Sequence, residues 1–276
     1  MIFVYKRWDA FCKELALKGL HSIPTKDIVP SATQYIVLKH DVETDVTKAY
    51  KLASIEYKYG HRGSYYVQAY LMHDTANIRL LQEIQQMGHE ISYHYDVMDS
   101  CKGNLEMAIQ EFAANKLLFE QNGFTIETVC QHGNPVVDRI GYTSNRDFFR
   151  SDKVRALYPH IVDVMVNLQS DVPTDFTYYS DAGRVFKMIY DPLTNDIVNS
   201  DNKNVSYQDL DELMVALDLN KGIIISTHPH RWCGSAVGYL AKTYMFKAIR
   251  ATAKALMRIP LAKKIMSRYY YLAKKI

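Results

Sequence analysis

Short apolar runs along the chain alternate with longer stretches in which apolar residues recur every three or four positions. The first run, Ile36–Leu38, is rich in β-branched residues and predicts a buried strand whose end carries His40 and Asp41. Similar runs predict further strands at residues 64–68, 90–94, 128–131, 177–179, 185–189 and 223–227. The chain therefore has enough strands for one large sheet.

Helical patterns fill the intervals between most of these strands. One begins near Thr44, a second follows Asp74, and a third spans residues 105–119, and each ends at a glycine that can close a helix. Ser206 is predicted to cap a further helix. Because helices of this length serve as crossovers, the strands are expected to run parallel and to form an α/β barrel or a barrel-like sheet. A length of 276 residues suits one such domain with appendages.

The distribution of charge separates the body of the chain from its C-terminal end. Residues 1–237 carry 23 Lys/Arg and 30 Asp/Glu, whereas residues 238–276 carry ten Lys/Arg and no acid. Apolar residues interleave with these ten cations, which predicts a basic amphipathic helical tail with a break at Pro260. Such a tail suits either the surface of an anionic membrane or a docking site on the acidic body. No motif for reading nucleic acid accompanies it, so no nucleic-acid partner is expected.

Two further features bear on the compartment. No window of the chain has the apolar length of a membrane span, and residues 1–20 lack the continuous apolar run of a signal peptide. The four cysteines are scattered and form no C-x-x-C pair, which favours a reducing compartment. The expected location is the cytoplasm, where the basic tail can hold the protein at the inner face of the membrane.

Histidine and aspartate residues follow several of the predicted strands. They are His40, Asp41, His94, Asp96, His132, Asp181 and His228. Because the carboxyl ends of parallel strands meet at one edge of a sheet, these side chains are expected to gather there. Imidazole and carboxylate are ligands of Zn²⁺ and of other divalent transition metals, so this edge predicts a metal site.

Three segments have the form of known sequence motifs. They are LKHDV at residues 38–42, GHEISYH at 88–94 and ISTHP at 225–229. In order, strand placement and spacing they resemble the first, second and last motifs of the polysaccharide deacetylases, carbohydrate esterase family 4. The segment CQHGNP at 130–135 is similar to a motif of a divergent subgroup that is associated with surface-polysaccharide gene loci.

The resemblance covers residues 36–232 and implies a fold. That fold is a distorted, incomplete TIM-like (β/α) barrel, which we place at residues 36–237. Residues 1–35 are then expected to form a helical segment that packs on the barrel, and residues 238–276 the basic tail.

The resemblance also implies a metal site. Asp41 and His94 fall on metal-binding positions of the family motifs, and His40 falls on the position of the general base. The position of the second metal-binding histidine holds Met98, a thioether better suited to packing. We therefore favour His132, from the next strand, as the third ligand. The alternatives left open for that ligand are Asp96, Asp99 and Asp181.

The last motif places His228 where the family has a catalytic histidine that protonates the leaving amine. Asp96 and Asp181 are expected at the substrate pocket together with Trp232, although a tryptophan that plugs the mouth of the barrel is an equal alternative. The implied function is a metal-dependent hydrolase, with zinc as the expected ion. It would remove acetyl from an N-acetylated sugar of a surface polysaccharide or its precursor, as in lipopolysaccharide biosynthesis.

Two other functions are compatible with the sequence. The first is a metal-free or catalytically altered barrel that binds or otherwise modifies a glycan, since positions 40 and 98 depart from the family motifs. The second is a hydrolase with a cysteine nucleophile, either Cys130 near His132 or Cys233 near His230. Serine chemistry is not indicated, because the chain lacks G-x-S-x-G.

Overall fold

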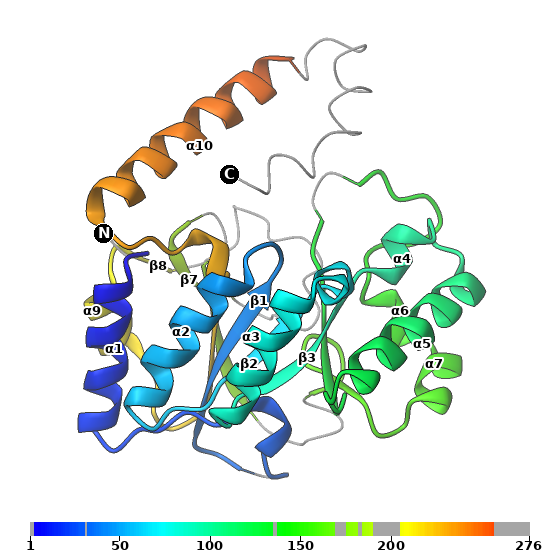
Figure 1. Ribbon diagram of the computed structural model, residues 1–276, viewed down its shortest axis with the longest axis horizontal. Coiled ribbons are helices and arrows are strands. Elements are labelled where there is room, and N and C mark those ends of the chain that lie inside the picture. Colours follow the sequence, from blue (N-terminus) through cyan, green and yellow to red (C-terminus); the bar gives the residue numbers. More distant parts are fainter. Residues whose placement is uncertain are drawn as a thin grey trace.

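The computed structural model describes residues 3–30, 32–134, 137–168, 175–181, 184–189 and 205–256, with side chains of the last helix described up to Met245 and at Ala248. Within these residues nine strands form one sheet (Figure 1). The strands are β1 (Tyr35–Val42), β2 (Ser64–Val67), β3 (Glu90–Tyr95), β4 (Thr128–Gln131), β5 (Val162–Asp163), β6 (Phe176–Ser180), β7 (Phe186–Ile189), β8 (Ser206–Tyr207) and β9 (Gly222–Thr227). Their order across the sheet is β5-β4-β3-β2-β1-β9-β6-β7-β8.

Helices separate most of the strands along the chain. They are α1 (Tyr5–Leu17), α2 (Val46–Lys58), α3 (Thr75–Gln86), α4 (Val97–Ser100), α5 (Leu105–Gln121), α6 (Asp147–Arg150), α7 (Asp152–Leu157), α9 (Leu210–Ala216) and α10 (Ala236–Leu256). Short 3₁₀ helices lie at Thr25–Asp27, Ala69–His73 and Pro229–Arg231. Figure 1 shows α1, α2 and α3 side by side along the sheet, with α5, α6 and α7 grouped together on the right of the view.

The expected alternation of strands and helices is confirmed, and with it the α/β class. Every pairing from β5 through β1 and β9 to β6 is parallel, whereas β7 pairs antiparallel with both β6 and β8. Among the described strands β5 and β8 stand at the two ends of the series, so closure into a barrel is not observed.

One predicted helix start is wrong. Ser206 lies in strand β8, where it pairs with Lys187 of β7. The capping residue is Asp209, three residues later, whose side chain accepts hydrogen bonds from the backbone N–H groups of Asp211 and Glu212, so the helix begins at Leu210. Of the predicted tail, residues up to 256 belong to α10, and the part that contains Pro260 lies outside the described residues.

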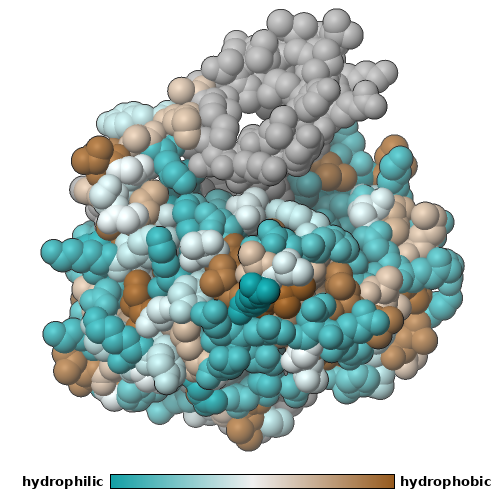
Figure 2. Space-filling view, in the orientation of Figure 1, coloured by the Kyte–Doolittle hydropathy of each residue, from teal (hydrophilic) through white to brown (hydrophobic). Residues whose placement is uncertain are grey.

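Strand β1 is the centre of the sheet. It pairs with β2 on one side and with β9 on the other, and all eight of its residues are buried. Helix α1 packs on the sheet through Trp8, Phe11 and Leu15, which join a core cluster with residues of β1, β9 and α9. In the orientation of Figure 1 the space-filling view shows hydrophilic residues over most of the visible described surface, with hydrophobic residues in small groups between them (Figure 2). None of the described helices is long and apolar enough to span a bilayer.

Gly63 lets β2 begin directly beside β1. A Cβ atom at this position would lie 2.6 Å from the carbonyl oxygen of Leu38 and 3.1 Å from Oε2 of the buried Glu56. The first of these atoms belongs to the backbone of the central strand and cannot move without disturbing the sheet. Glycine is therefore required here by the close approach of two backbone segments of the same chain.

We expect Gly63→Ala to lower the free energy of unfolding by about 1–3 kcal/mol, because the added methyl group overpacks a site bounded by backbone. Urea denaturation measures this cost. Gly234→Ala is the matched control, since nothing lies within 4 Å of the corresponding Cβ position. Equal stability of the two variants would show that the close approach at Gly63 is not a constraint.

Candidate active site

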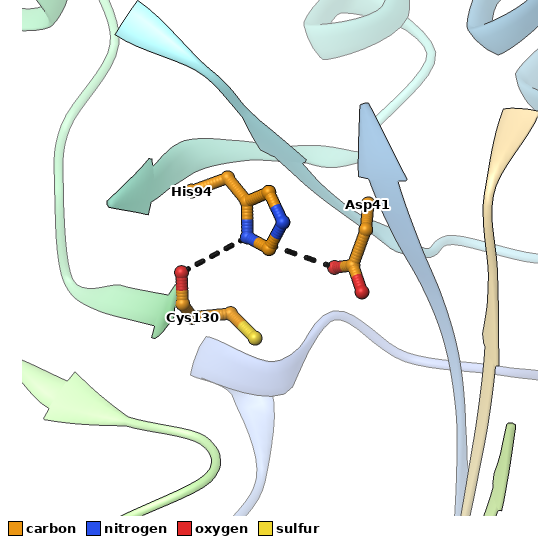
Figure 3. Close-up of side chains that lie close together, drawn as sticks. All are labelled: Asp41, His94 and Cys130. Atoms are coloured by element: carbon orange, nitrogen blue, oxygen red, sulfur yellow. Dashed lines mark hydrogen bonds and ion pairs between the residues drawn. The ribbon is translucent and has the colours of Figure 1, made fainter. Parts of the chain in front are cut away.

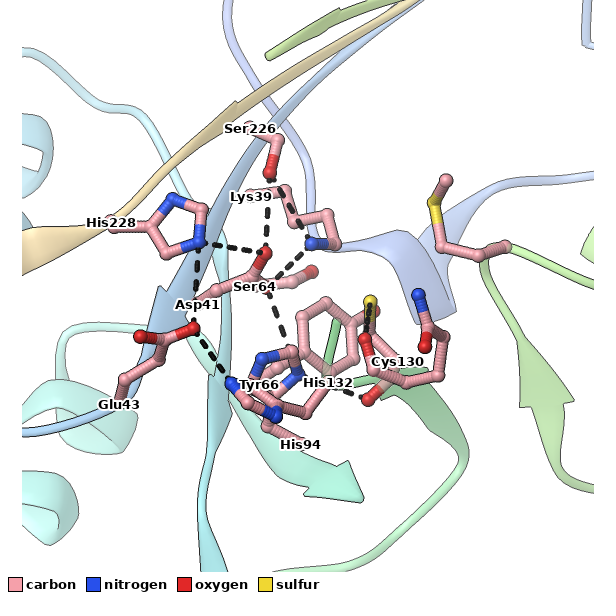
Figure 4. Close-up of polar contacts among 12 residues, drawn as sticks. Lys39, Asp41, Glu43, Ser64, Tyr66, His94, Cys130, His132, Ser226 and His228 are labelled. Carbon is pink, nitrogen blue, oxygen red and sulfur yellow. Dashed lines mark hydrogen bonds and ion pairs between the residues drawn. The ribbon is translucent and has the colours of Figure 1, made fainter. Parts of the chain in front are cut away.

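The candidate site lies at the carboxyl ends of β1, β3, β4, β6 and β9 (Figure 4). Side chains alternate between the two faces of a strand, so Lys39 and Asp41 of β1 share one face and His40 takes the other. Glu43, directly after β1, joins the face of Asp41. Parallel pairing brings His94 of β3 beside β4, in register with Cys130.

Glu43, His94 and His132 form a compact group of possible metal ligands. Each offers one ligand atom within 4.8 Å of the others, and all three residues are buried. His132 Nε2 lies 3.0 Å from Glu43 Oε1, and the rings of His94 and His132 are perpendicular with centroids 5.2 Å apart. Glu43 is not among the ligands predicted from the sequence. Its position two residues after Asp41, hence on the same face, was the available signal.

A second group shares His94 and consists of Asp41, His94 and Cys130 (Figure 3). His94 Nδ1 lies 3.0 Å from the carbonyl oxygen of Cys130 and 4.0 Å from Asp41 Oδ1. A proton on Nδ1 that is donated to this carbonyl leaves Nε2 as a lone-pair donor. Burial lowers the pKa of His94 to about 3, which keeps the ring neutral. Burial raises the pKa of the Cys130 thiol well above its usual range, which makes it a poor nucleophile at neutral pH.

Asp41 already has a buried cation as its partner. Lys39 Nζ lies 2.5 Å from Asp41 Oδ1 and 3.3 Å from Ser226 Oγ, and the lysine side chain is 1% exposed. Burial acts to raise the pKa of Asp41, but the Lys39 ammonium and the nearby His94 and His228 lower it to about 2. A metal ion on Asp41 would therefore compete with Lys39 for this carboxylate. The sequence hint was a charged residue directly after three apolar ones inside a buried strand.

His228 and Asp181 form a hydrogen-bonded pair. Asp181 is fully buried, and its Oδ1 lies 2.7 Å from His228 Nδ1 while its Oδ2 accepts from the backbone N–H of His228 at 2.9 Å. Thr227 Oγ1 and Arg231 also donate to this carboxylate. Burial acts to raise the pKa of Asp181, but Arg231 and His228 hold it well below its usual range. The other ring nitrogen, His228 Nε2, lies 3.7 Å from Glu43 Oε1 and 4.0 Å from Asp41 Oδ2.

The structure does not bring His40 into this site. Its ring is fully buried on the opposite face of β1, with Nε2 2.8 Å from Oε1 of Glu56 in α2. The ring also stacks on Tyr65, with centroids 4.2 Å apart. The position predicted for the general base therefore faces α2 and the core, because adjacent strand residues cannot both point to one side.

The three residues expected at the substrate pocket have different positions. Trp232 is fully buried, donates from Nε1 to Thr227 Oγ1 at 2.9 Å and packs edge-on against Trp8. Asp181 is also fully buried, so neither side chain offers surface to a sugar. Asp96 is half-buried directly before α4 and belongs to neither ligand group among the described residues. Met98 is buried in a core cluster, which confirms its packing role.

Comparison with known proteins adds little to this description. Neither the protein-family models nor the curated proteins compared with the chain give a match. Among solved structures, the catalytic domain of peptidoglycan N-acetylglucosamine deacetylase from Eubacterium rectale is similar to this chain. The alignment covers 81% of this chain and 88% of that chain, at 12% sequence identity and a TM-score of 0.42. A similarity of this degree leaves the function to be argued from the residues of the site.

We expect Lys39→Met to lower the free energy of unfolding by about 3–5 kcal/mol, because it leaves the Asp41 carboxylate buried without its cation. Lys39→Met combined with Asp41→Asn should recover a large part of that loss, since both charges are then removed. Urea denaturation at neutral pH measures the unmodified protein, Lys39→Met, Asp41→Asn and the double variant. Lys58→Met is the control, because the Lys58–Asp9 pair is exposed to solvent and its loss should change the stability little. Additive costs for the two substitutions would contradict a coupled buried pair.

Proposed function

We propose that this protein is a metal-dependent hydrolase that removes the acetyl group from an N-acetylated sugar of a surface polysaccharide or its precursor. One observation carries the reaction type: the ligand group of Glu43, His94 and His132 lies beside the His228 Nε2 that Asp181 orients. The resemblance of the three sequence motifs to those of polysaccharide deacetylases supports the substrate class.

The donor set fits a catalytic divalent ion. Two imidazoles and one carboxylate are the ligands of many hydrolytic zinc sites, which keep a further position open. We assign Glu43 rather than Asp41 as the carboxylate ligand, because Lys39 is already paired with Asp41. A bound ion would polarise the acetamido carbonyl and lower the pKa of a bound water to about 7.

Proton transfer is the task of His228. Its Nδ1–H donates to Asp181, which fixes the tautomer and leaves Nε2 to accept a proton from the attacking water. The same nitrogen then returns the proton to the sugar nitrogen as the C–N bond breaks, so that the products are acetate and a free amine. The side chain of His228 keeps 16% exposure, which allows contact with a substrate. In this proposal His228 takes the base role that the sequence had given to His40.

The first test is release of acetate from N-acetylated sugars in free, nucleotide-linked and oligomeric form. His228→Ala should lower kcat by about 10²–10⁴-fold, because one residue supplies both proton transfers. Asp181→Asn should also lower kcat, since the tautomer of His228 is no longer fixed. His160→Ala, at an exposed histidine between α7 and β5, is the control and should retain full activity. Retention of activity within a few-fold in His228→Ala would overturn the assignment.

The second test is metal content by elemental analysis. The purified protein should hold about one divalent transition-metal ion per chain, and Glu43→Gln and His94→Ala should each lose it. Cys130→Ser should keep the ion, because the thiol belongs to the less favourable ligand group. Metal loss in Cys130→Ser with retention in Glu43→Gln would reverse the choice between the two groups. No metal in any of the proteins, even after titration, would favour the alternative of a metal-free protein that binds or otherwise modifies a glycan.

A further inference from the structure

Helix α10 carries a stripe of exposed apolar side chains. Val237, Leu240 and Tyr244 are 77%, 42% and 67% exposed, and Met245 beside them is 42% exposed. On a helix of 3.6 residues per turn, positions 237, 240 and 244 fall on one face. Ala241 and Ala248, both exposed, extend the same face. We call this set the α10 stripe.

The first turns of α10 contact the body of the protein through the side of the helix opposite the α10 stripe. Tyr239 is partly buried and lies against Phe3, with ring centroids 6.3 Å apart. Lys242 lies close to Lys48 of α2, and burial together with this second ammonium lowers the pKa of Lys48 to about 8. Figure 1 shows the rest of α10 running away from the sheet and from the other helices. The α10 stripe therefore belongs to the side of the helix that the body does not cover.

The charge of this part of the chain has one sign. The helix contains Lys242, Lys247, Arg250 and Lys254, and these positions fall outside the arc of the α10 stripe. No Asp or Glu follows position 237, and residues 238–276 contain ten Lys/Arg in total. An apolar face bordered by cations, with no acid to offset them, is complementary to the surface of an anionic bilayer.

We propose that α10 binds the surface of an anionic lipid bilayer, with the α10 stripe inserted among the lipid headgroups and the lysine and arginine residues paired with lipid phosphates. A second copy of the chain is a less suitable occupant, because antiparallel or parallel pairing of two α10 helices would bring together the four cations of each, eight like charges in all. Docking on the body of the same chain would leave the stripe exposed, since the body already contacts the other side of the helix. This proposal does not depend on the proposed enzymatic activity.

Sedimentation of the full chain with lipid vesicles tests the proposal. The protein should bind vesicles that contain phosphatidylglycerol and phosphatidylcholine, bind vesicles of phosphatidylcholine alone much more weakly, and dissociate as salt is raised. Val237→Ser combined with Leu240→Ser should weaken binding by about tenfold or more, because two apolar groups no longer leave water. The matched control is Leu17→Ser with Val215→Ser, which removes the same two kinds of apolar side chain, exposed at 77% and 88%, from α1 and α9.

The vesicle experiment has a control for folding and three outcomes that would contradict the proposal. Circular dichroism establishes that both double variants are folded before binding is compared. Equal weakening by the two double variants, or equal binding to both kinds of vesicle, overturns the proposal. A dimer of the free protein that dissociates in the Val237→Ser, Leu240→Ser variant also overturns it and identifies a second copy as the occupant. Vesicle binding is measured without substrate, so a failure here is distinct from a failure of the acetate assay.

Discussion

The alternation of side chains along β1 divides the polar residues of this strand into two buried groups. Lys39 and Asp41 face the ends of β3, β4 and β9, whereas His40 faces α2. A slip of one residue in the pairing of β1 with β2 and β9 would exchange these faces and place a lysine and an aspartate against the helix. The position of the candidate site therefore depends on the register of the central strand.

The buried polar group on the side of β1 that faces α2 helps to hold this register. Glu56 of α2 is fully buried, and its carboxylate accepts hydrogen bonds from Trp8 Nε1 at 2.9 Å and from Tyr65 Oη at 2.8 Å. His40 Nε2 lies 2.8 Å from the same carboxylate, so α1, α2, β1 and β2 all meet at one charged side chain. Burial acts to raise the pKa of Glu56, but His40, His89 and Tyr65 lower it. A buried carboxylate tolerates few arrangements of its partners, which makes this cluster a determinant of how the helices sit on the sheet.

The sequence predicts seven of the nine described strands, because these seven are long enough to show an apolar or alternating pattern, and the parallel order follows from the helices between them. The two-residue strands β5 and β8 are too short to give such a pattern. The sequence also predicts the sheet edge that holds His94, His132 and His228, because the carboxyl ends of parallel strands meet at one edge. It could not predict that Asp181 pairs with His228, because this contact depends on β6 lying beside β9, far from it in sequence. The position of His40 has a simpler origin, since it and Asp41 are adjacent within β1 and alternation places their side chains on opposite faces.

The electrostatic arrangement favours neutral nitrogen ligands at the site. Lys39 and Arg231 neutralise Asp41 and Asp181, and both carboxylates have pKa values below the usual range for that reason. With these charges paired internally, neither aspartate raises the pKa of His94 above neutrality, and burial keeps that ring uncharged. A neutral imidazole presents a lone pair instead of a positive charge, which is the state that a divalent cation requires of a histidine. The two buried ion pairs thus support the same chemistry as the proposed ligands, although neither Lys39 nor Arg231 need touch the metal.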